Sequence, residues 1–294
     1  MKALRLPQIH AWLSAAVMLL GLNRPAPGTE VGPADQGLRV FSAGHSFHMF
    51  VPKMLAELAG AAGIAGHRQA GVSSIGGSYV HQHWDVADEK NSLKAALRAG
   101  QVDVLTLSPI YLPDDGIENF VRLGLEHRPD IRVTVQEFWL PFDVFDVNYK
   151  KRRPGPVDRS SRTAAELRSI NEPYFRSMDD HVRALNQKFG RQVVHVVPVG
   201  QAVLALRTRI IGGAAPGLKR QDDLFTDAIG HATPPLQWLT AYCHFAVIYR
   251  RSPAGLPCPQ ALAREAHGEA LNRLLQALAW EAVKSHPLSG IQAR

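Results

Sequence analysis

The sequence predicts a three-layer α/β/α sandwich built on a parallel, five-stranded sheet of flavodoxin-like order. Short apolar runs typical of buried strands alternate five times with segments whose apolar residues recur at helical spacing. The clearest run, 102–107, is almost continuously apolar, as in a strand that helices cover on both faces. This alternation favours an open parallel sheet with helices on both sides.

The first half of the domain contains three of the expected strands. Val40, Phe41 and Ala43 predict a short buried strand, which Gly44 ends. The remaining elements of this half, in order, are a helix over 49–65, a weak strand over 69–74, a helix over 91–99 and the strand 102–107.

The second half is dominated by long helical patterns. Segment 162–189 is predicted as a long helix or a helix pair interrupted near Pro173, because proline removes a helical hydrogen bond. The irregular, charged stretch 141–161 is predicted as a surface loop. The other elements, in order, are a helix over 115–127, strands over 131–135 and 193–198, and helices over 202–210, 234–249 and 260–285.

The first residues have the features of a secretory signal peptide. Lys2 and Arg5 precede an apolar run over 11–22 that is too short to span a bilayer comfortably. We therefore expect an exported protein, periplasmic or secreted, with no stable membrane span after cleavage; an uncleaved N-terminal anchor is the alternative. The predicted organisation is a signal peptide over 1–26, a linker over 27–37 and one domain over 38–294.

Charge and cysteine content narrow the function classes. Removing residues 1–26 takes away three basic and no acidic residues, so the formal charge falls from +7 to +4. This mild excess, with one dense basic run at 150–153 that is typical of a solvated loop, argues against nucleic-acid binding. Cys243 and Cys258 are the only cysteines, and both a disulfide and two free thiols are open.

Three polar residues form a candidate catalytic set. Ser46 follows Gly44 at the carboxyl end of the first strand, where α/β proteins place reactive groups; the competing interpretation is a serine that caps the next helix. Asp227 and His231 lie together late in the chain and supply a general base with the acid that orients it. A histidine in such a place is also compatible with an ordinary loop residue.

These motifs, in this order, resemble the SGNH or GDSL-type hydrolase superfamily. The segment 43–47 resembles its first block, with His45 in place of the usual Asp or Asn, and 75–78 resembles its glycine block. The segment 227–231 resembles its Asp-x-x-His block with one additional residue. The resemblance covers most of residues 38–255 and implies that Ser46 is the nucleophile, His231 the base and Asp227 the acid.

The third block of the family is altered. Residues 105–110 occupy the place where the resemblance implies an oxyanion-hole asparagine, and Ser108 offers a hydroxyl there instead. With the amides of Ser46 and of Gly76 or Gly77, it forms the expected oxyanion hole. Loss of one oxyanion donor costs about 10²–10³-fold in turnover, so a slow esterase and a catalytically silent relative both stay open.

Other side chains predict substrate contacts rather than chemistry. Aromatic and imidazole groups near presumed strand ends predict a substrate-binding rim; they are His45, Tyr79, Trp84 and Tyr111. Their alternative role is packing in the core. A zinc site built from His45, His48, His81 and His83 is the alternative for these imidazoles, but no carboxylate or cysteine completes a recognisable spacing, so neither a metal nor another cofactor is expected.

The sequence thus predicts an exported serine hydrolase that cleaves a carboxylic ester. An acyl group on a carbohydrate is the expected substrate, because the resembled family often acts on such esters. The alternative is a non-catalytic relative that binds a carbohydrate or another ligand. The sequence leaves the acyl group, the alcohol and the oligomeric state open.

Overall fold

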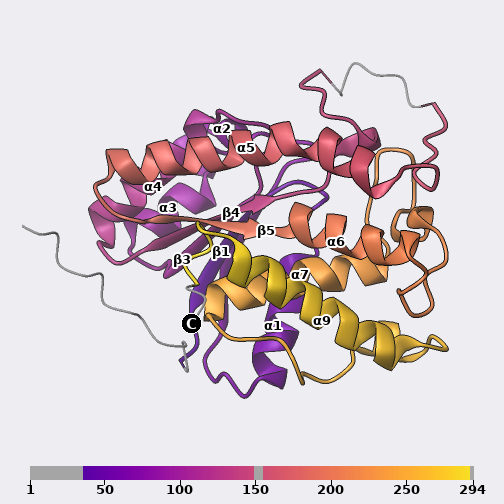
Figure 1. Ribbon diagram of the computed structural model, residues 1–294. Coiled ribbons are helices and arrows are strands. Elements are labelled where there is room, and N and C mark those ends of the chain that lie inside the picture. Colours follow the sequence, from indigo (N-terminus) through magenta and orange to yellow (C-terminus); the bar gives the residue numbers. More distant parts are fainter. Residues whose placement is uncertain (1–35, 149–154, 292–294) are drawn as a thin grey trace, which may run out of the picture. The chain divides into compact units, whose positions relative to one another are not determined.

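A parallel sheet forms the centre of the fold. The computed structural model describes residues 36–148 and 155–291, which lie within the compact unit Pro33–Arg294. All strand pairs are parallel, in the order β2-β1-β3-β4-β5, which confirms the predicted flavodoxin-like sheet (Figure 1). The strands are β1 (Arg39–Gly44), β2 (Arg68–Ser74), β3 (Val104–Leu107), β4 (Arg132–Glu137) and β5 (Val194–Pro198).

Helices cover both faces of this sheet, as predicted for a three-layer sandwich. In Figure 1, α3, α4 and α5 lie on one side of the strands, and α1, α7 and α9 lie on the other. The helices are α1 (Val51–Ala61), α2 (Val80–Trp84), α3 (Ser92–Arg98), α4 (Asp115–His127), α5 (Ala164–Lys188), α6 (Val199–Ile211), α7 (Pro234–Tyr249), α8 (Gln260–Ala263) and α9 (Gly268–Ser285). Because α7 packs against both α1 and α9, nearly all of its residues are buried.

Two of the predicted helices differ from the structure. The segment around Pro173 is not interrupted: α5 is one helix of 25 residues that contains the proline. Pro173 and Ser169, whose carbonyl loses its amide partner, both lie on the exposed face, where water can satisfy that carbonyl. The predicted helix 260–285 is instead two helices, α8 and α9, separated by 264–267.

Side-chain caps set the starts of three helices. The side chains of Asn91 and Asp114 accept amide hydrogen bonds at the beginnings of α3 and α4. Thr163 and Glu166 form a reciprocal capping box at the start of α5. These caps place the loops that follow the strands and therefore fix what lies at the carboxyl edge of the sheet.

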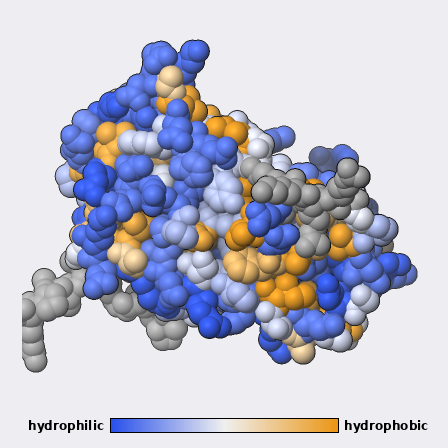
Figure 2. Space-filling model, turned by 90° about the horizontal axis from the view of Figure 1, so that it is seen from above, coloured by the Kyte–Doolittle hydropathy of each residue, from blue (hydrophilic) through white to orange (hydrophobic). Residues whose placement is uncertain are grey.

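The surface is mostly polar on the face drawn in Figure 2, and both cysteines are free. The face seen in Figure 2 is largely hydrophilic, with hydrophobic residues in separate patches. Among the described residues, no helix combines the length and the apolar character that crossing a membrane requires. Cys243 is buried, Cys258 is half-buried, and both are free thiols. The predicted signal peptide and the basic run 150–153 lie outside the described residues, as does all of the predicted linker except 36–37.

Candidate active site

Ser46 lies in the turn that joins β1 to α1, at the carboxyl edge of the sheet. The turn is closed by hydrogen bonds from the amides of His48 and Met49 to the carbonyl of His45, at 2.9 and 3.1 Å. Helix α1 begins only at Val51, and its N-cap residue, Phe50, forms no side-chain cap. The helix-cap interpretation of Ser46 is therefore wrong. Its side chain is exposed, while its neighbours on both sides are buried.

The structure brings Ser46, His231 and Asp227 together in one hydrogen-bonded chain. The Nε2 atom of His231 lies 2.9 Å from the hydroxyl of Ser46. On the other side of the ring, Nδ1 lies 2.6 Å from the Oδ2 atom of Asp227. Both distances are within hydrogen-bond reach, so a proton can pass from serine to imidazole without movement of the backbone. The interpretation of His231 as an isolated loop histidine is wrong.

The additional residue between Asp227 and His231 is absorbed by a tight turn. The Oδ1 atom of Asp227 accepts hydrogen bonds from the amides of Gly230, at 2.8 Å, and His231, at 3.1 Å. Gly230 has a φ of +105°, a conformation that L side chains rarely adopt. A backbone bridge between Phe225 and Ala232 closes the base of the turn. We call residues 225–232 the acid–base turn.

These contacts determine the charge of the acid. Burial raises the pKa of Asp227, but hydrogen bonds from the imidazole and amide of His231 and from the amide of Gly230 outweigh it, so the net pKa is lowered. Asp227 is therefore ionised at neutral pH and keeps the proton of His231 on Nδ1. The Nε2 atom is then the acceptor that faces Ser46.

The rings of Phe47 and Trp139 pack beside the imidazole of His231 and the acid–base turn. Phe47 stacks on Trp139 with ring centroids 4.7 Å apart, and its edge meets the ring of His231 at 5.4 Å. Trp139 is buried and donates a hydrogen bond of 2.7 Å from Nε1 to the carbonyl of Gly230. Both rings thus connect β1 and β4 to the acid–base turn.

A buried polar network lies behind the nucleophile turn. The Oε1 atom of Gln136 lies 2.8 Å from Nδ1 of His48 and 2.8 Å from Nε2 of His244, while its Nε2 donates to the carbonyl of Phe47 at 3.0 Å. Because one oxygen accepts from both rings, each neutral imidazole carries its proton on the atom that faces Gln136. Burial lowers the pKa of His48 to about 4 and the pKa of His244 well below its ordinary value.

The loop with the two predicted oxyanion glycines follows β2 and lies beside β1. The amide of Ile75 donates to the carbonyl of Gly44 at 3.1 Å. A Cβ atom at Gly76 would meet no atom within 4 Å, so there is open space next to this residue, and Gly77 has a φ of +55°. The imidazole of His83 lies 2.7 Å from the hydroxyls of both Ser73 and Ser78, so it fastens the two ends of this loop.

Ser108, the substitute for the missing asparagine, is buried. Its hydroxyl lies 3.2 Å from Nε2 of His45, which is buried as well. A Cβ atom at Gly44 would come within 2.8 Å of the Cβ of Ser108, so the end of β1 and the end of β3 are in close contact. The imidazole of His45 is thus a partner of the Ser108 hydroxyl.

The predicted substrate-binding rim is corrected at three residues. His45 is only 4% exposed and contacts Ser108, so its imidazole lies inside the fold and not at a rim. Tyr111 is only 2% exposed and packs among Phe138, Phe145 and Tyr174, so its ring belongs to the core. Trp84 packs edge-on against Phe120 with the ammonium of Lys94 over its ring, so it too has a packing role. Tyr79 is half-buried and stacks on His81, at the start of α2.

The four histidines of the candidate zinc site have separate partners. His45 contacts Ser108, His48 contacts Gln136, and His83 bridges two serines; His81 lies 3.6 Å from the carboxylate of Asp114. In residues 36–148 and 155–291, no group of three or more histidine, cysteine or acidic side chains is arranged to hold a metal ion.

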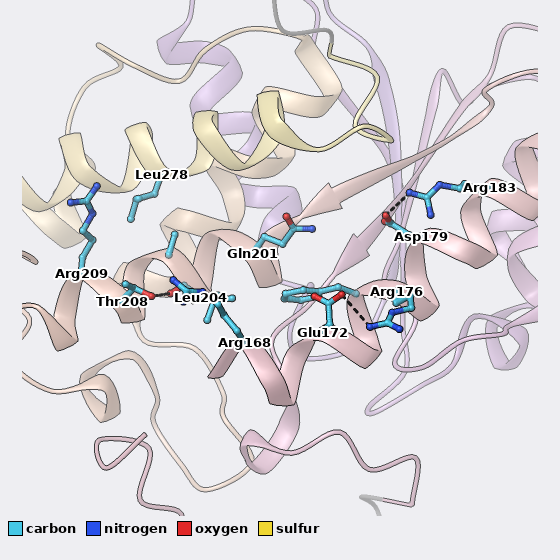
Figure 3. A pocket seen from close by; sticks show the side chains of 12 residues that line it. Arg168, Glu172, Arg176, Asp179, Arg183, Gln201, Leu204, Thr208, Arg209 and Leu278 are labelled. Atoms are coloured by element: carbon cyan, nitrogen blue, oxygen red, sulfur yellow. Dashed lines mark hydrogen bonds and ion pairs between the residues drawn. The ribbon is translucent and has the colours of Figure 1, made fainter. Parts of the chain in front are cut away.

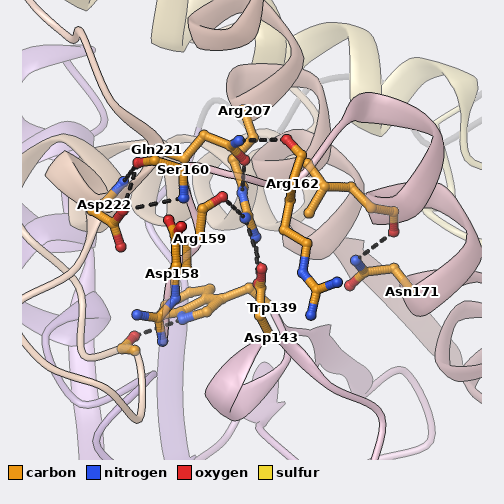
Figure 4. A network of polar contacts seen from close by, with 12 residues as sticks. Trp139, Asp143, Asp158, Arg159, Ser160, Arg162, Asn171, Arg207, Gln221 and Asp222 are labelled. Atoms are coloured by element: carbon orange, nitrogen blue, oxygen red, sulfur yellow. Dashed lines mark hydrogen bonds and ion pairs between the residues drawn. The ribbon is translucent and has the colours of Figure 1, made fainter. Parts of the chain in front are cut away.

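The sequence interpretation missed a buried arginine beside the acid–base turn. Arg159 is 2% exposed and donates to the carbonyls of Asp227 and Ala228 at 3.2 and 2.6 Å. It belongs to a polar network with Arg207, Asp143 and the segment around Asp222 (Figure 4). Arg159 lies in an irregular stretch without periodicity, so no pattern in the sequence identifies it.

A groove of about 690 Å³ lies elsewhere, among α5, α6 and α9. Figure 3 shows arginine and acidic side chains along it, including the pairs Arg176–Glu172 and Arg183–Asp179. The sequence-predicted site residues are not among the residues that line it. Arg176 and Arg183 pair with acidic residues of the same helix, α5, and the hydrogen-bonded chain at Ser46 is the candidate site.

Comparison with known proteins supports the fold. No protein-family profile and no curated protein matches the sequence. The structure is similar to that of a DUF4886 family protein from Bacteroides uniformis, with 16% identity and a TM-score of 0.56 over 84% of this chain and 95% of that one. This likeness supports the three-layer arrangement of the fold.

Two further solved structures show more distant similarity. A putative SGNH hydrolase from Slackia heliotrinireducens is 13% identical, with a TM-score of 0.43 over 71% of this chain and 97% of that one. Phospholipase A1 from Streptomyces albidoflavus is 10% identical, with a TM-score of 0.41 over 72% of this chain and 99% of that one.

Proposed function

We propose that this protein is an exported serine hydrolase that cleaves carboxylic esters. The observation that carries the proposal is the hydrogen-bonded chain from the Ser46 hydroxyl through His231 to Asp227, with distances of 2.9 and 2.6 Å. An exposed serine hydrogen-bonded to an imidazole, which is itself hydrogen-bonded to an ionised carboxylate, is the arrangement that activates a hydroxyl for acyl transfer.

The reaction follows from this geometry. The Ser46 oxygen attacks the ester carbonyl carbon while Nε2 of His231 takes the hydroxyl proton, and Asp227 stabilises the imidazolium that forms. The amides of Ser46 and of Gly76 or Gly77 are the proposed donors to the oxyanion. Collapse of the tetrahedral intermediate expels the alkoxide, which receives the proton from His231. Water, activated by the same imidazole, then hydrolyses the acyl-enzyme and regenerates the serine.

The substrate we propose is an acyl ester of a carbohydrate. The side chains of His231 and Asp227 are 39% and 44% exposed, so the reacting groups stand at the surface, where a bulky alcohol has access. The stacked rings of Tyr79 and His81 at the start of α2 are the contacts that we propose for such an alcohol. The substrate class itself comes from the resemblance to the family and not from these contacts.

Covalent labelling tests the nucleophile directly. A fluorophosphonate should modify the folded protein once, at Ser46, and the Ser46→Ala variant should show neither modification nor turnover of a short acyl ester. The Ser169→Ala variant, changed on the exposed face of α5, is the matched control and should behave as the wild type. Complete inertness of folded wild-type protein would instead support a ligand-binding relative without catalysis.

A further inference from the structure

We propose that Arg159 is a positioning residue that holds the acid–base turn in its reactive geometry. The inference rests on the proposed function, since it assigns a role toward Asp227 and His231. Its guanidinium contacts neither Ser46 nor the imidazole, and it acts through the backbone of the turn.

The contacts of Arg159 fall on the backbone next to the acid. One terminal nitrogen donates to the carbonyl of Asp227 at 3.2 Å, and the other donates to the carbonyl of Ala228 at 2.6 Å. The planar, forked guanidinium fixes the spacing and direction of two successive carbonyls at once, which an ammonium group cannot do. Rotation of this peptide would swing the carboxylate of Asp227 away from His231.

The same guanidinium also lies close to Phe225 and Gly230 of the turn. Its central carbon lies 4.3 Å from the ring centroid of Phe225, the residue whose bridge to Ala232 closes the turn. A Cβ atom at Gly230 would come within 3.2 Å of the Arg159 guanidinium. The group therefore lies against the beginning of the turn, at Phe225, and against its middle, at 227–230.

Hydrogen bonds hold the backbone of Arg159 and of the next residue. Its carbonyl accepts a hydrogen bond of 3.3 Å from Arg207, whose guanidinium forms a buried ion pair with Asp143. The next residue, Ser160, binds the carboxylate of Asp222 through its amide at 3.1 Å and its hydroxyl at 2.5 Å. Figure 4 shows these contacts around Arg159. They hold the backbone from which the guanidinium extends toward the turn.

The consequence for the reaction is geometric. The Ser46 hydroxyl and His231 lie on different segments, so the 2.9 Å between them depends on the conformation of the acid–base turn. A misplacement of about 1 Å far from the reacting atoms can cost about 10²-fold in rate. Loss of Arg159 is therefore expected to lower the reactivity of Ser46 while the fold persists.

The test measures the rate of phosphonylation at Ser46. Arg159→Ala should lower this rate by about 10- to 100-fold, and free guanidinium at millimolar concentration should restore part of it by occupying the vacated site. Arg159→Lys, which keeps the charge but not the fork, should lie between the two. Arg168→Ala, which removes an exposed arginine on α5, is the matched control and should label at the wild-type rate.

A second measurement separates positioning from folding and from the proposed function. In a Ser46→Ala background, the low-field proton signal of the Nδ1–H···carboxylate hydrogen bond of His231 should weaken or shift when Arg159 is replaced. Wild-type labelling rates in folded Arg159→Ala and Arg159→Lys would overturn the proposal. So would a loss that follows thermal stability alone and that guanidinium does not restore. An inert wild type would refute the proposed function, and the proton signal would still decide the role of Arg159.

Discussion

The carboxylate of Asp227 has two tasks, and a different oxygen performs each. Oδ1 accepts the amides of Gly230 and His231 and so shapes the turn, whereas Oδ2 accepts the proton of Nδ1 and orients the imidazole. A substitution that changes one oxygen only can therefore separate structure from chemistry.

Asp227→Asn is expected to keep the turn and lose the reaction. The amide oxygen of asparagine can still accept both backbone amides, but its NH₂ group then faces Nδ1 and favours the wrong imidazole tautomer. Turnover should fall by about 10³–10⁴-fold, with little change in the midpoint of thermal unfolding. Steady-state kinetics and circular dichroism check this; activity within tenfold of the wild type would show that Asp227 does not orient the base.

The residues of the hydrogen-bonded chain were predictable because each stands in a short motif at a predicted element boundary. Ser46 follows the first strand, and Asp227 and His231 precede a helix, so the order along a parallel fold indicated that they meet. Arg159 and Trp139 were not predictable in these roles. Both donate hydrogen bonds to backbone carbonyls of the turn. Every residue has such a carbonyl, so the sequence does not indicate which one these side chains contact.

At the scale of elements, the acid–base turn depends on one backbone conformation. Gly230 combines a φ of +105° with close approach by Arg159 and Trp139, whose nitrogens would lie 3.2 and 3.5 Å from an added Cβ atom. A left-handed conformation alone costs an L residue about 1–2 kcal/mol. The approach of Arg159 adds to this strain because 3.2 Å is tighter than an ordinary Cβ contact, whereas the 3.5 Å to Trp139 is an ordinary contact.

Gly230→Ala is therefore expected to lower the free energy of unfolding by about 2 kcal/mol or more and to impair turnover strongly. Gly213→Ala is the matched control, because Gly213 has a φ of +66° but open space around its Cβ position. It should cost about 1 kcal/mol and leave turnover unchanged. Urea unfolding and ester hydrolysis measure both effects; equal results for the two variants would contradict the packing argument.

Elements with strong periodicity were predicted well, and the failures have local causes. The exposed position of Pro173 lets α5 continue where a buried proline would have ended it. The split between α8 and α9 was missed because the leucine stripe belongs to α9 alone. Helix α2, of five residues, is too short to show a period.

At the scale of the whole molecule, a parallel sheet with helices on both faces was predictable from the alternation of strands and helices, but the buried polar groups were not. Four histidines are buried and have pKa values depressed by burial: to about 4 for His48 and His83, to about 3 for His195, and well below its ordinary value for His244. The polarity of these residues predicts exposure, and only their contacts reveal why they are inside.

These histidines predict acid sensitivity. A histidine whose folded pKa lies below its unfolded value of 6.5 binds more protons when unfolded, so stability falls as the pH drops from about 6.5 toward 4. A shift of this size corresponds to about 3 kcal/mol for each of His48 and His83. Urea unfolding between pH 4 and pH 8 should show this loss, and constant stability over that range would contradict it.

The buried carboxyl of Glu137 changes stability with pH in the opposite direction to the histidines. It is buried at the end of β4, where burial raises its pKa to about 7, while the backbone amide and the side chain of Gln201 donate to it at 3.0 and 3.1 Å. Because the folded pKa lies above the unfolded value of 4.5, this group destabilises the fold as the pH rises from about 4.5 to 7. One such carboxyl is outweighed by the set of buried histidines.

Glu137→Gln isolates the contribution of this carboxyl, because glutamine keeps the shape and stays neutral at every pH. Relative to the wild type, the variant should gain about 3 kcal/mol of unfolding free energy between pH 5 and pH 8. Glu126→Gln, at an exposed position on α4, is the matched control and should show a difference that does not change with pH. Urea unfolding of all three proteins at several pH values measures this. A pH-independent difference for Glu137→Gln would mean that Glu137 is ionised throughout and that its hydrogen bonds with Gln201 compensate for its burial.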